Sequence, residues 1–234
     1  MFTKIKISLL PVAMAILLGL ATGLSGCGEM VSAPVEESRS ETITPYYFNL
    51  DEHHKYTYLV DDKRFAQVPY ELSMHMEGRH EDEEFGPGLP IYECDWYSTG
   101  TQIPGGYYHG YYAMNDQMAY YMGSNPKPET FVWLDLVAPV ERGQRWSFPY
   151  GIDSNNTINA EIRKTGLTAS IKDSSGEPVL FKDVIEVVYI NPAERDTTVK
   201  WFGKGSALIA EWKYNSKGEK YHSKQLLKYE YVED

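Results

Sequence analysis

The sequence predicts an all-β fold, an antiparallel curved sheet of the half-barrel or sandwich type. From Tyr46 onward the chain is a series of short runs rich in Tyr, Val, Ile, Thr and Trp, the residues that favour strands. In the clearest run, residues 70–77, apolar and polar side chains alternate, which is the period of a half-buried strand. No stretch shows a helical period over about twelve residues.

Turn sequences separate the predicted strands. They are Pro104-Gly105-Gly106, Asn115-Asp116, Ser174-Ser175-Gly176, Asn191-Pro192 and Asn215-Ser216-Lys217-Gly218. The predicted strands cover residues 55–60, 70–77, 91–97, 107–114, 118–122, 130–137, 157–163, 167–172, 184–190, 197–202, 207–214 and 224–231. Many short strands joined by tight turns favour an antiparallel sheet in a single domain.

The start of the chain has the layout of a lipoprotein signal peptide. Lys4 and Lys6 form a basic beginning, and a mainly apolar run over residues 7–20 follows. This run is shorter than the roughly 18–20 apolar residues that a membrane-spanning helix needs. Leu24-Ser25-Gly26-Cys27 then places two small residues between a leucine and a cysteine, the pattern of a lipobox. We therefore expect a signal peptide over residues 1–26, cleaved before the cysteine.

Cleavage at this site would make Cys27 the lipidated first residue of the mature chain. Each buried methylene of an acyl chain such as palmitate contributes about 0.8 kcal/mol, so two or three chains anchor a protein to membrane lipid. Residues 28–44 are polar and acidic, so residues 27–44 are predicted to form the lipidated start and flexible tether of one domain over residues 45–234. Gly28 stands where an aspartate would signal retention at the inner membrane. We expect the periplasmic side of the outer membrane in a host with two membranes, and otherwise the outer face of the plasma membrane.

Composition excludes several classes of function. The formal net charge of −11 repels nucleic acid, so no nucleic-acid partner is expected. The sequence contains no nucleophile elbow, zinc-protease motif, phosphate-binding loop or dinucleotide fingerprint, so neither an enzyme nor a cofactor is predicted. Cys94 lies between Glu93 and Asp95, a setting opposite to that of a reactive thiol, and is predicted to be a buried core residue.

Four short motifs carry a resemblance to a known group of proteins. They are Tyr47-Phe48-Asn49-Leu50, Gly143-Gln144-Arg145-Trp146, the strand at 181–187 and the hairpin at 201–209. On these motifs the chain resembles uncharacterised bacterial membrane-anchored lipoproteins with a curved antiparallel β-sheet domain. The resemblance implies the fold and an envelope location, but no activity. The predicted architecture is also similar to the half-barrels of lipoprotein carriers, which hold acyl chains in a concave face.

Tyrosine doublets provide candidates for ligand binding. In a strand, neighbouring side chains point to opposite faces, so each doublet places one ring on each face. Tyr107, Tyr111 and Tyr120 are the candidate ligand-facing rings, since tyrosine combines apolar area with a hydroxyl and suits sugars or protein partners. Ordinary strand preference and pairing of the rings across strands explain the same pattern.

An acidic stretch containing histidines is the candidate for metal binding. His75, His80, Glu81 and Glu83 could bring nitrogen and oxygen ligands together, but their spacing matches no known metal motif. We expect residues 77–84 to form a solvated hairpin tip that binds no metal tightly. The sequence as a whole therefore predicts a non-catalytic binding or scaffold lipoprotein of the cell envelope. Its partner would be an envelope protein, a glycan or an apolar ligand. A carrier of an apolar or acyl ligand and an envelope hydrolase are the alternatives.

Overall fold

A computed structural model describes residues 41–66, 68–85, 88–98, 106–126, 132–150 and 156–232, apart from the side chains of residues 81–84. Within these residues the fold is one antiparallel sheet of twelve strands, which confirms the predicted fold class. In the part of the chain that the structure describes, no helix has the length and apolar character that crossing a membrane would require.

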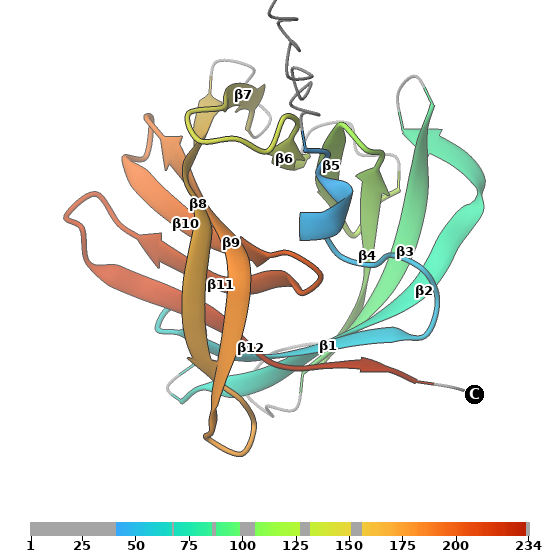
Figure 1. Cartoon of the computed structure of the whole chain (residues 1–234), viewed down its shortest axis with the longest axis horizontal. Coiled ribbons are helices and arrows are strands. Elements are labelled where there is room, and N and C mark those ends of the chain that lie inside the picture. Colours follow the sequence, from blue (N-terminus) through green and yellow to red (C-terminus); the bar gives the residue numbers. More distant parts are fainter. Residues whose placement is uncertain are drawn as a thin grey trace, which may run out of the picture. The chain divides into compact units, whose positions relative to one another are not determined.

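The strands follow one another around the sheet almost in chain order (Figure 1). Their bounds are β1 His54–Asp62, β2 Tyr70–Phe85, β3 Leu89–Ser98, β4 Tyr107–Met114, β5 Met118–Gly123, β6 Trp133–Val137, β7 Arg145–Pro149, β8 Thr157–Lys172, β9 Pro178–Asn191, β10 Asp196–Gly203, β11 Ala207–Tyr214 and β12 Lys220–Tyr231. The spatial order is β6-β5-β4-β3-β2-β1-β12-β11-β10-β9-β8-β7. Each half is thus a meander of hairpins, and the pairing of β1 with β12 joins the two halves.

The sheet curls until its edge strands β6 and β7 approach each other. The described residues form no strand ladder between them, and side chains bridge the edges instead. Trp146 donates a hydrogen bond from Nε1 to the carbonyl oxygen of Leu134 at 3.2 Å. The rings of Trp133 and Phe148 pack edge to face with their centroids 5.3 Å apart. The sheet is therefore nearly closed and encloses its own core.

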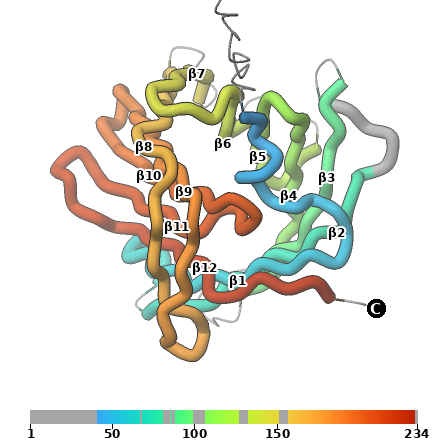
Figure 2. The backbone as a smooth tube through the Cα atoms, viewed as in Figure 1, coloured from blue at the N-terminus to red at the C-terminus, as the bar shows by residue number. Residues whose placement is uncertain are grey.

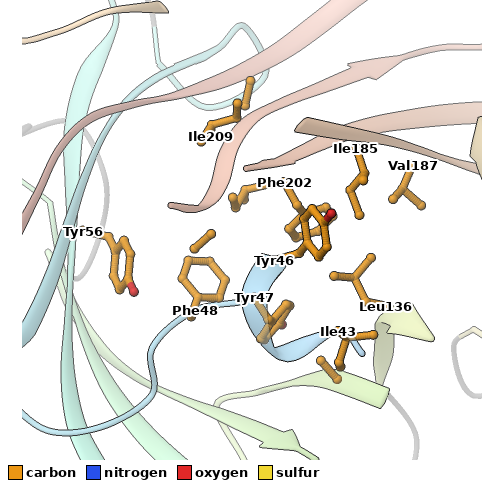
Figure 3. Packing of buried hydrophobic residues seen from close by; sticks show 14 of the residues in the cluster. Ile43, Tyr46, Tyr47, Phe48, Tyr56, Leu136, Ile185, Val187, Phe202 and Ile209 are labelled. Carbon is orange, nitrogen blue, oxygen red and sulfur yellow. The ribbon is translucent and has the colours of Figure 1, made fainter. Parts of the chain in front are cut away.

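The residues before β1 fill part of the interior. The 3-10 helix η1, Thr44–Tyr46, and the segment after it run inside the curled sheet (Figure 2). Tyr46, Tyr47 and Phe48 pack there against side chains of the surrounding strands, including Phe202 (Figure 3). The concave face of the sheet must be covered, and η1 with the residues between it and β1 covers part of it. We call these residues the plug segment. Their buried rings stabilise the plug segment and the sheet.

The ordered fold begins earlier than the sequence indicated. Ile43, which falls in the predicted tether, is fully buried, and its backbone N–H donates to the carbonyl oxygen of Asp116 at 3.1 Å. Glu41 accepts a hydrogen bond from the backbone N–H of Val140 at 2.9 Å. The prediction of a tether is therefore wrong for residues 41–44. The predicted cleavage and lipidation residues, Gly26 and Cys27, lie outside the described residues.

Three strand predictions need correction. The runs at 157–163 and 167–172 belong to one strand, β8, which stays paired with β9 through several register shifts. Gly166 has a φ of +65°, which lets the strand bend without ending. Strand β7 was not predicted, because only Trp146 and Phe148 of its five residues are apolar, too few to show a strand period. The acidic stretch predicted as a hairpin tip instead extends β2 to Phe85. Cys94 is fully buried as predicted.

Candidate ligand-binding cavity

The interior of the curled sheet contains a cavity of about 370 Å³. This volume is near the lower end of the range of about 300–1,000 Å³ that small-molecule sites occupy. One part of its lining is aromatic, with Phe48, Tyr70, Trp96, Tyr108, Tyr112, Tyr121, Trp133, Tyr150 and Phe202. The other part is charged, with Asp62, Arg64, Asp135, Lys200, Glu211, Lys213, His222 and Lys224.

The tyrosine doublets divide between the two faces of the sheet, as the strand period predicts. The members that line the cavity are Tyr108, Tyr112 and Tyr121. The predicted ligand-facing rings, Tyr107, Tyr111 and Tyr120, are not part of its lining. Tyr111 and Tyr120 instead pack in a separate apolar cluster around Ile91. Alternation places the two tyrosines of a doublet on opposite faces of the sheet, but only the curvature of the sheet decides which face is the inner one.

Two buried acids and one lysine form the centre of the charged lining. Lys200 on β10 lies with its Nζ 2.5 Å from Asp135 Oδ1 on β6 and 3.5 Å from Glu211 Oε2 on β11. Asp135 also accepts a hydrogen bond from the hydroxyl of Tyr47 at 2.6 Å. The hydroxyl of Tyr189 donates to the backbone oxygen of Asp135. The network therefore connects the plug segment with both halves of the sheet.

The same network continues toward β1. His222 Nε2 lies 3.2 Å from Glu211 Oε1, and His222 Nδ1 lies 2.8 Å from Asp62 Oδ2. Arg64 holds Asp62 from the other side, with its NH2 nitrogen 3.1 Å from Oδ2. Burial would raise the pKa of Glu211, but the charges of Lys213 and Lys200 together with His222 hold it well below its ordinary value. Glu211 therefore stays ionised at neutral pH.

Among the cations of the cavity lining, Lys224 differs in what its ammonium group contacts, which is aromatic rings. Its Nζ lies over the rings of Tyr58 and Trp96, 4.3 Å and 4.7 Å from their centroids. No carboxylate of the described residues lies within 4.0 Å of it, although Glu211 faces it across the β11–β12 ladder. Burial lowers the pKa of Lys224 to about 8, because a charged ammonium is disfavoured away from water.

Removing this charge should stabilise the empty domain. An unfolded lysine keeps its proton up to a pKa of about 10.4, so the folded chain binds fewer protons than the unfolded chain between about pH 8 and that value. The contribution of Lys224 to stability thus rises with pH across this window. We expect Lys224→Met to raise the free energy of unfolding at pH 7 by about 1–3 kcal/mol, and the difference to shrink at pH 10. Urea denaturation at both pH values measures this.

The matched control for this prediction is Lys228→Met, on the same strand but exposed and paired with Glu230. It should change the stability by less than about 0.5 kcal/mol. A destabilised Lys224→Met, or a difference that does not depend on pH, would contradict the expectation.

The two histidines of the predicted metal stretch are not part of the cavity lining. His75 on β2 packs against Tyr97, with ring centroids 4.8 Å apart. His80 Nδ1 lies 3.0 Å from Glu93 Oε2, a carboxylate that the sequence analysis did not select for metal binding. The side chains of Glu81 and Glu83 are outside the described residues. The structure thus brings His80 to an acid on β3, because β2 and β3 pair along this stretch.

None of the charged residues that line the cavity was predicted from the sequence. A signal was nevertheless present. Lys200 shares its strand face with Phe202, and Asp135 stands between Leu134 and Leu136. Charged residues at such positions of a predicted core strand are rarely buried unless they are paired, so several of them predict a buried ion network.

Comparison with known proteins identifies no family. No protein-family model matches the chain, and no curated protein matches it. Among solved structures, the chain is similar to a proposed exported protein with a YmcC-like fold from Bacteroides fragilis, with 12% identity and a TM-score of 0.43 over 80% of this chain and 99% of that one. It is also similar to a proposed lipoprotein from Parabacteroides distasonis, with 11% identity and a TM-score of 0.42 over 80% of this chain and 99% of that one. What this chain binds must be inferred from its own residues.

Proposed function

We propose that this protein is a lipid-anchored lipoprotein of the bacterial cell envelope whose β domain binds an anionic sugar in the interior cavity, without catalysis. The observation that carries the proposal is Lys224, an ammonium held over two rings with no carboxylate of the described residues at ion-pair distance. A partly buried charge without a partner at ion-pair distance is costly, and a bound anion would supply the partner.

The balance of charges in the lining supports an anion. The lining contains four cations against three anions, which leaves one positive charge in excess before His222 is counted. The cations are Arg64, Lys200, Lys213 and Lys224, and the anions are Asp62, Asp135 and Glu211. This is opposite in sign to the net charge of −11 of the whole chain. The cavity is therefore a local positive site in an acidic protein, and its field attracts negative ligands.

The aromatic part of the lining supports a sugar as the body of the ligand. Tyr108, Tyr112 and Tyr121 present rings from neighbouring strands, and tyrosine offers a face for stacking together with a hydroxyl for hydrogen bonds. An acyl chain would gain nothing from the charged half of the cavity and would leave its ions without water. The lining thus favours a glycan over the apolar ligand.

A binding role without catalysis agrees with the state of the acids. Each carboxylate that lines the cavity is held by a cation within 3.5 Å, with Lys200 serving both Asp135 and Glu211 and Arg64 serving Asp62. The pKa of Glu211 is well below its ordinary value, so this carboxyl has no proton to donate as a general acid at neutral pH.

Sugar binding is tested on the purified full chain with D-glucuronate and D-glucose, which differ only in the carboxylate. A ligand that binds only the folded state raises the unfolding temperature, by an amount that grows with the logarithm of its concentration once this exceeds the dissociation constant. We expect glucuronate to raise the midpoint and glucose not to, and Lys224→Met to abolish the effect while Lys228→Met retains it. Acetate tests whether charge alone suffices. Equal responses to both sugars, or retention of binding by Lys224→Met, would overturn the proposal.

The lipid anchor is tested at Cys27. We expect labelled palmitate to enter the wild-type protein and to be lost completely in Cys27→Ala, because the acyl chains attach at that cysteine. Ser25→Thr, which keeps Cys27, serves as the control and should still be labelled. Palmitate incorporation that survives Cys27→Ala would disprove the anchor.

Sucrose-gradient fractionation tests the proposed membrane. In a host with two membranes, the wild-type protein should migrate with outer membranes, and Gly28→Asp should shift it to the inner membrane. Wild-type protein at the inner membrane, unchanged by this substitution, would contradict the outer-membrane location.

A further inference from the structure

The outer face of β3 and β4, opposite to the cavity, carries a compact group of metal-ligating side chains. Cys94 and Trp96 point inward from β3 and are buried, so Glu93 and Asp95 point outward. In the β3–β4 ladder Asp95 faces His109 directly. One ligand atom from each of Glu93, Asp95 and His109 lies within 4.8 Å of the other two.

The distances fit one coordination sphere. His109 Nδ1 lies 2.8 Å from Asp95 Oδ1 and 3.1 Å from Glu93 Oε1. Ligands of a tetrahedral zinc ion lie roughly 3.3–3.6 Å apart, since zinc–nitrogen and zinc–oxygen bonds measure about 2.0–2.2 Å. An opening of a few tenths of an ångström would thus admit an ion. All three residues lie on paired strands, so their backbone positions are fixed by the ladder.

A second observation separates this group from an ordinary surface ion pair. Asp95 is only 9% exposed, and its Oδ1 is buried with no hydrogen-bond partner in the part of the chain described. His109 Nδ1 lies 2.8 Å from this oxygen but is not oriented to donate a hydrogen bond to it. A buried carboxylate oxygen that accepts no hydrogen bond is costly, and a cation at this point would satisfy it.

The other carboxylate oxygens are held by neighbouring side chains. Asp95 Oδ2 accepts hydrogen bonds from the hydroxyls of Tyr107 at 3.0 Å and Tyr97 at 3.2 Å. Glu93 Oε2 lies 3.0 Å from His80 Nδ1. Each carboxylate is therefore oriented by its outer oxygen and presents the inner one toward His109. Such an arrangement is typical of the groups that orient metal ligands.

The electrostatic field at this face favours a cation. Burial, together with the nearby carboxylates of Asp95 and Glu93, raises the pKa of Glu77 on the adjacent strand. Glu77 therefore adds a third carboxylate to this face, and a divalent ion bound by Glu93 and Asp95 would reduce the repulsion that Glu77 experiences.

We propose that Glu93 Oε1, Asp95 Oδ1 and His109 Nδ1 bind one divalent transition-metal ion, with Zn²⁺ as the best fit. A mixed set of imidazole and carboxylate ligands suits zinc, whereas calcium and magnesium prefer oxygen ligands alone. The side chain of His109 is 48% exposed, so the remaining coordination position opens to solvent. Tyr97, Tyr107 and His80 are positioning residues, not ligands. Of the metal candidates selected from the sequence, only His80 belongs to this site, and Tyr107, selected there as a ligand-facing ring, belongs to it as well.

The test is calorimetric titration of the full chain, purified in detergent and freed of metal with a chelator. We expect ZnCl₂ to bind at one site per chain with a dissociation constant in the micromolar range or below, and CaCl₂ to give no saturable heat. His109→Ala and Glu93→Gln should each weaken zinc binding by more than 100-fold, since each removes one of three ligands. His80→Ala should weaken it by about 10- to 100-fold. His54→Ala is the control and should bind zinc as the wild type does, because His54 is a partly exposed histidine that lies outside the site and is hydrogen-bonded to Tyr229.

Co²⁺ provides a readout of coordination itself. A bound ion should give visible absorption bands typical of four- or five-coordinate cobalt, lost in His109→Ala and unchanged in His54→Ala. If His109 serves only as a protonated partner of the two acids, zinc gives no saturable heat and cobalt no new bands. Either that result or unchanged zinc affinity in His109→Ala would overturn the site. Circular dichroism confirms that each variant is folded.

Discussion

Replacing Lys200 with methionine should lower the free energy of unfolding by about 3–5 kcal/mol. Lys200 is buried, and its Nζ lies against both Asp135 and Glu211. Burial by itself would lower the pKa of Lys200, but the charges of these two acids raise it, so the lysine is charged in the folded state. Its removal would leave the buried carboxylate of Asp135 without a cation, whereas Glu211 keeps Lys213 at 3.3 Å. An uncompensated buried charge is among the most destabilising changes known.

Urea denaturation at pH 7 measures this effect, with Lys164→Met as the matched control. Lys164 also pairs with an acid, Glu186 at 3.0 Å, but its side chain is 56% exposed. Exposed pairs contribute about 0–1 kcal/mol, so this variant should remain close to the wild type. The double variant Lys200→Met with Asp135→Asn should recover part of the lost free energy of unfolding, because it also removes the buried charge of Asp135. Equal losses in Lys200→Met and Lys164→Met would show that the buried network does not stabilise the fold.

Replacing Tyr47 with alanine should cost about 3–5 kcal/mol, as large aromatic truncations in a core do. Tyr47 is 3% exposed and packs in the plug segment against Phe48, with ring centroids 5.1 Å apart. The ring also lies 6.1 Å from that of Phe202 on β10. Its hydroxyl donates to Asp135. The substitution would therefore open a void between the plug and the sheet and remove one donor from the ion network.

Tyr47→Phe separates the two contributions. It keeps the ring and removes only the hydroxyl, so it should cost about 1–3 kcal/mol through the lost hydrogen bond to the buried carboxylate. Tyr231→Ala is the control for tyrosine removal from the surface, since Tyr231 is 58% exposed. We expect it to change stability by about 0.5 kcal/mol or less. If Tyr47→Ala were as mild as this control, the segment before β1 would not be part of the core.

Much of the architecture follows from local sequence patterns. The period of two in residues 70–77 is seen in β2, and the turn at Asn115-Asp116 joins β4 to β5. Cys94 is buried because it alternates with acids that must face outward. Each of these depends on neighbours within a few residues, where strand alternation and turn chemistry act directly.

Where local patterns conflict, tertiary pairing decides. The acidic residues after Glu77 favour a turn, yet β2 runs on to Phe85 because β3 offers it a partner strand. The break between residues 163 and 167 likewise becomes a bend within β8, held by β9. Ile43 is buried although its neighbours are polar, because the open interior of the sheet needs a cover.

Local sequence patterns alone predicted the all-β class, most of the strands, the buried cysteine and the division of the tyrosine doublets within strands between two faces. The tertiary structure decided which face is the inner one, and therefore that Tyr108, Tyr112 and Tyr121 line the cavity. It also brought Asp135, Lys200 and Glu211 together from three strands, and Asp95 opposite His109. The physical reason is the same in each case. Alternation along a strand does not determine which set of side chains faces the interior. Contacts between strands depend on register and curvature, which arise only when the whole sheet closes around its core.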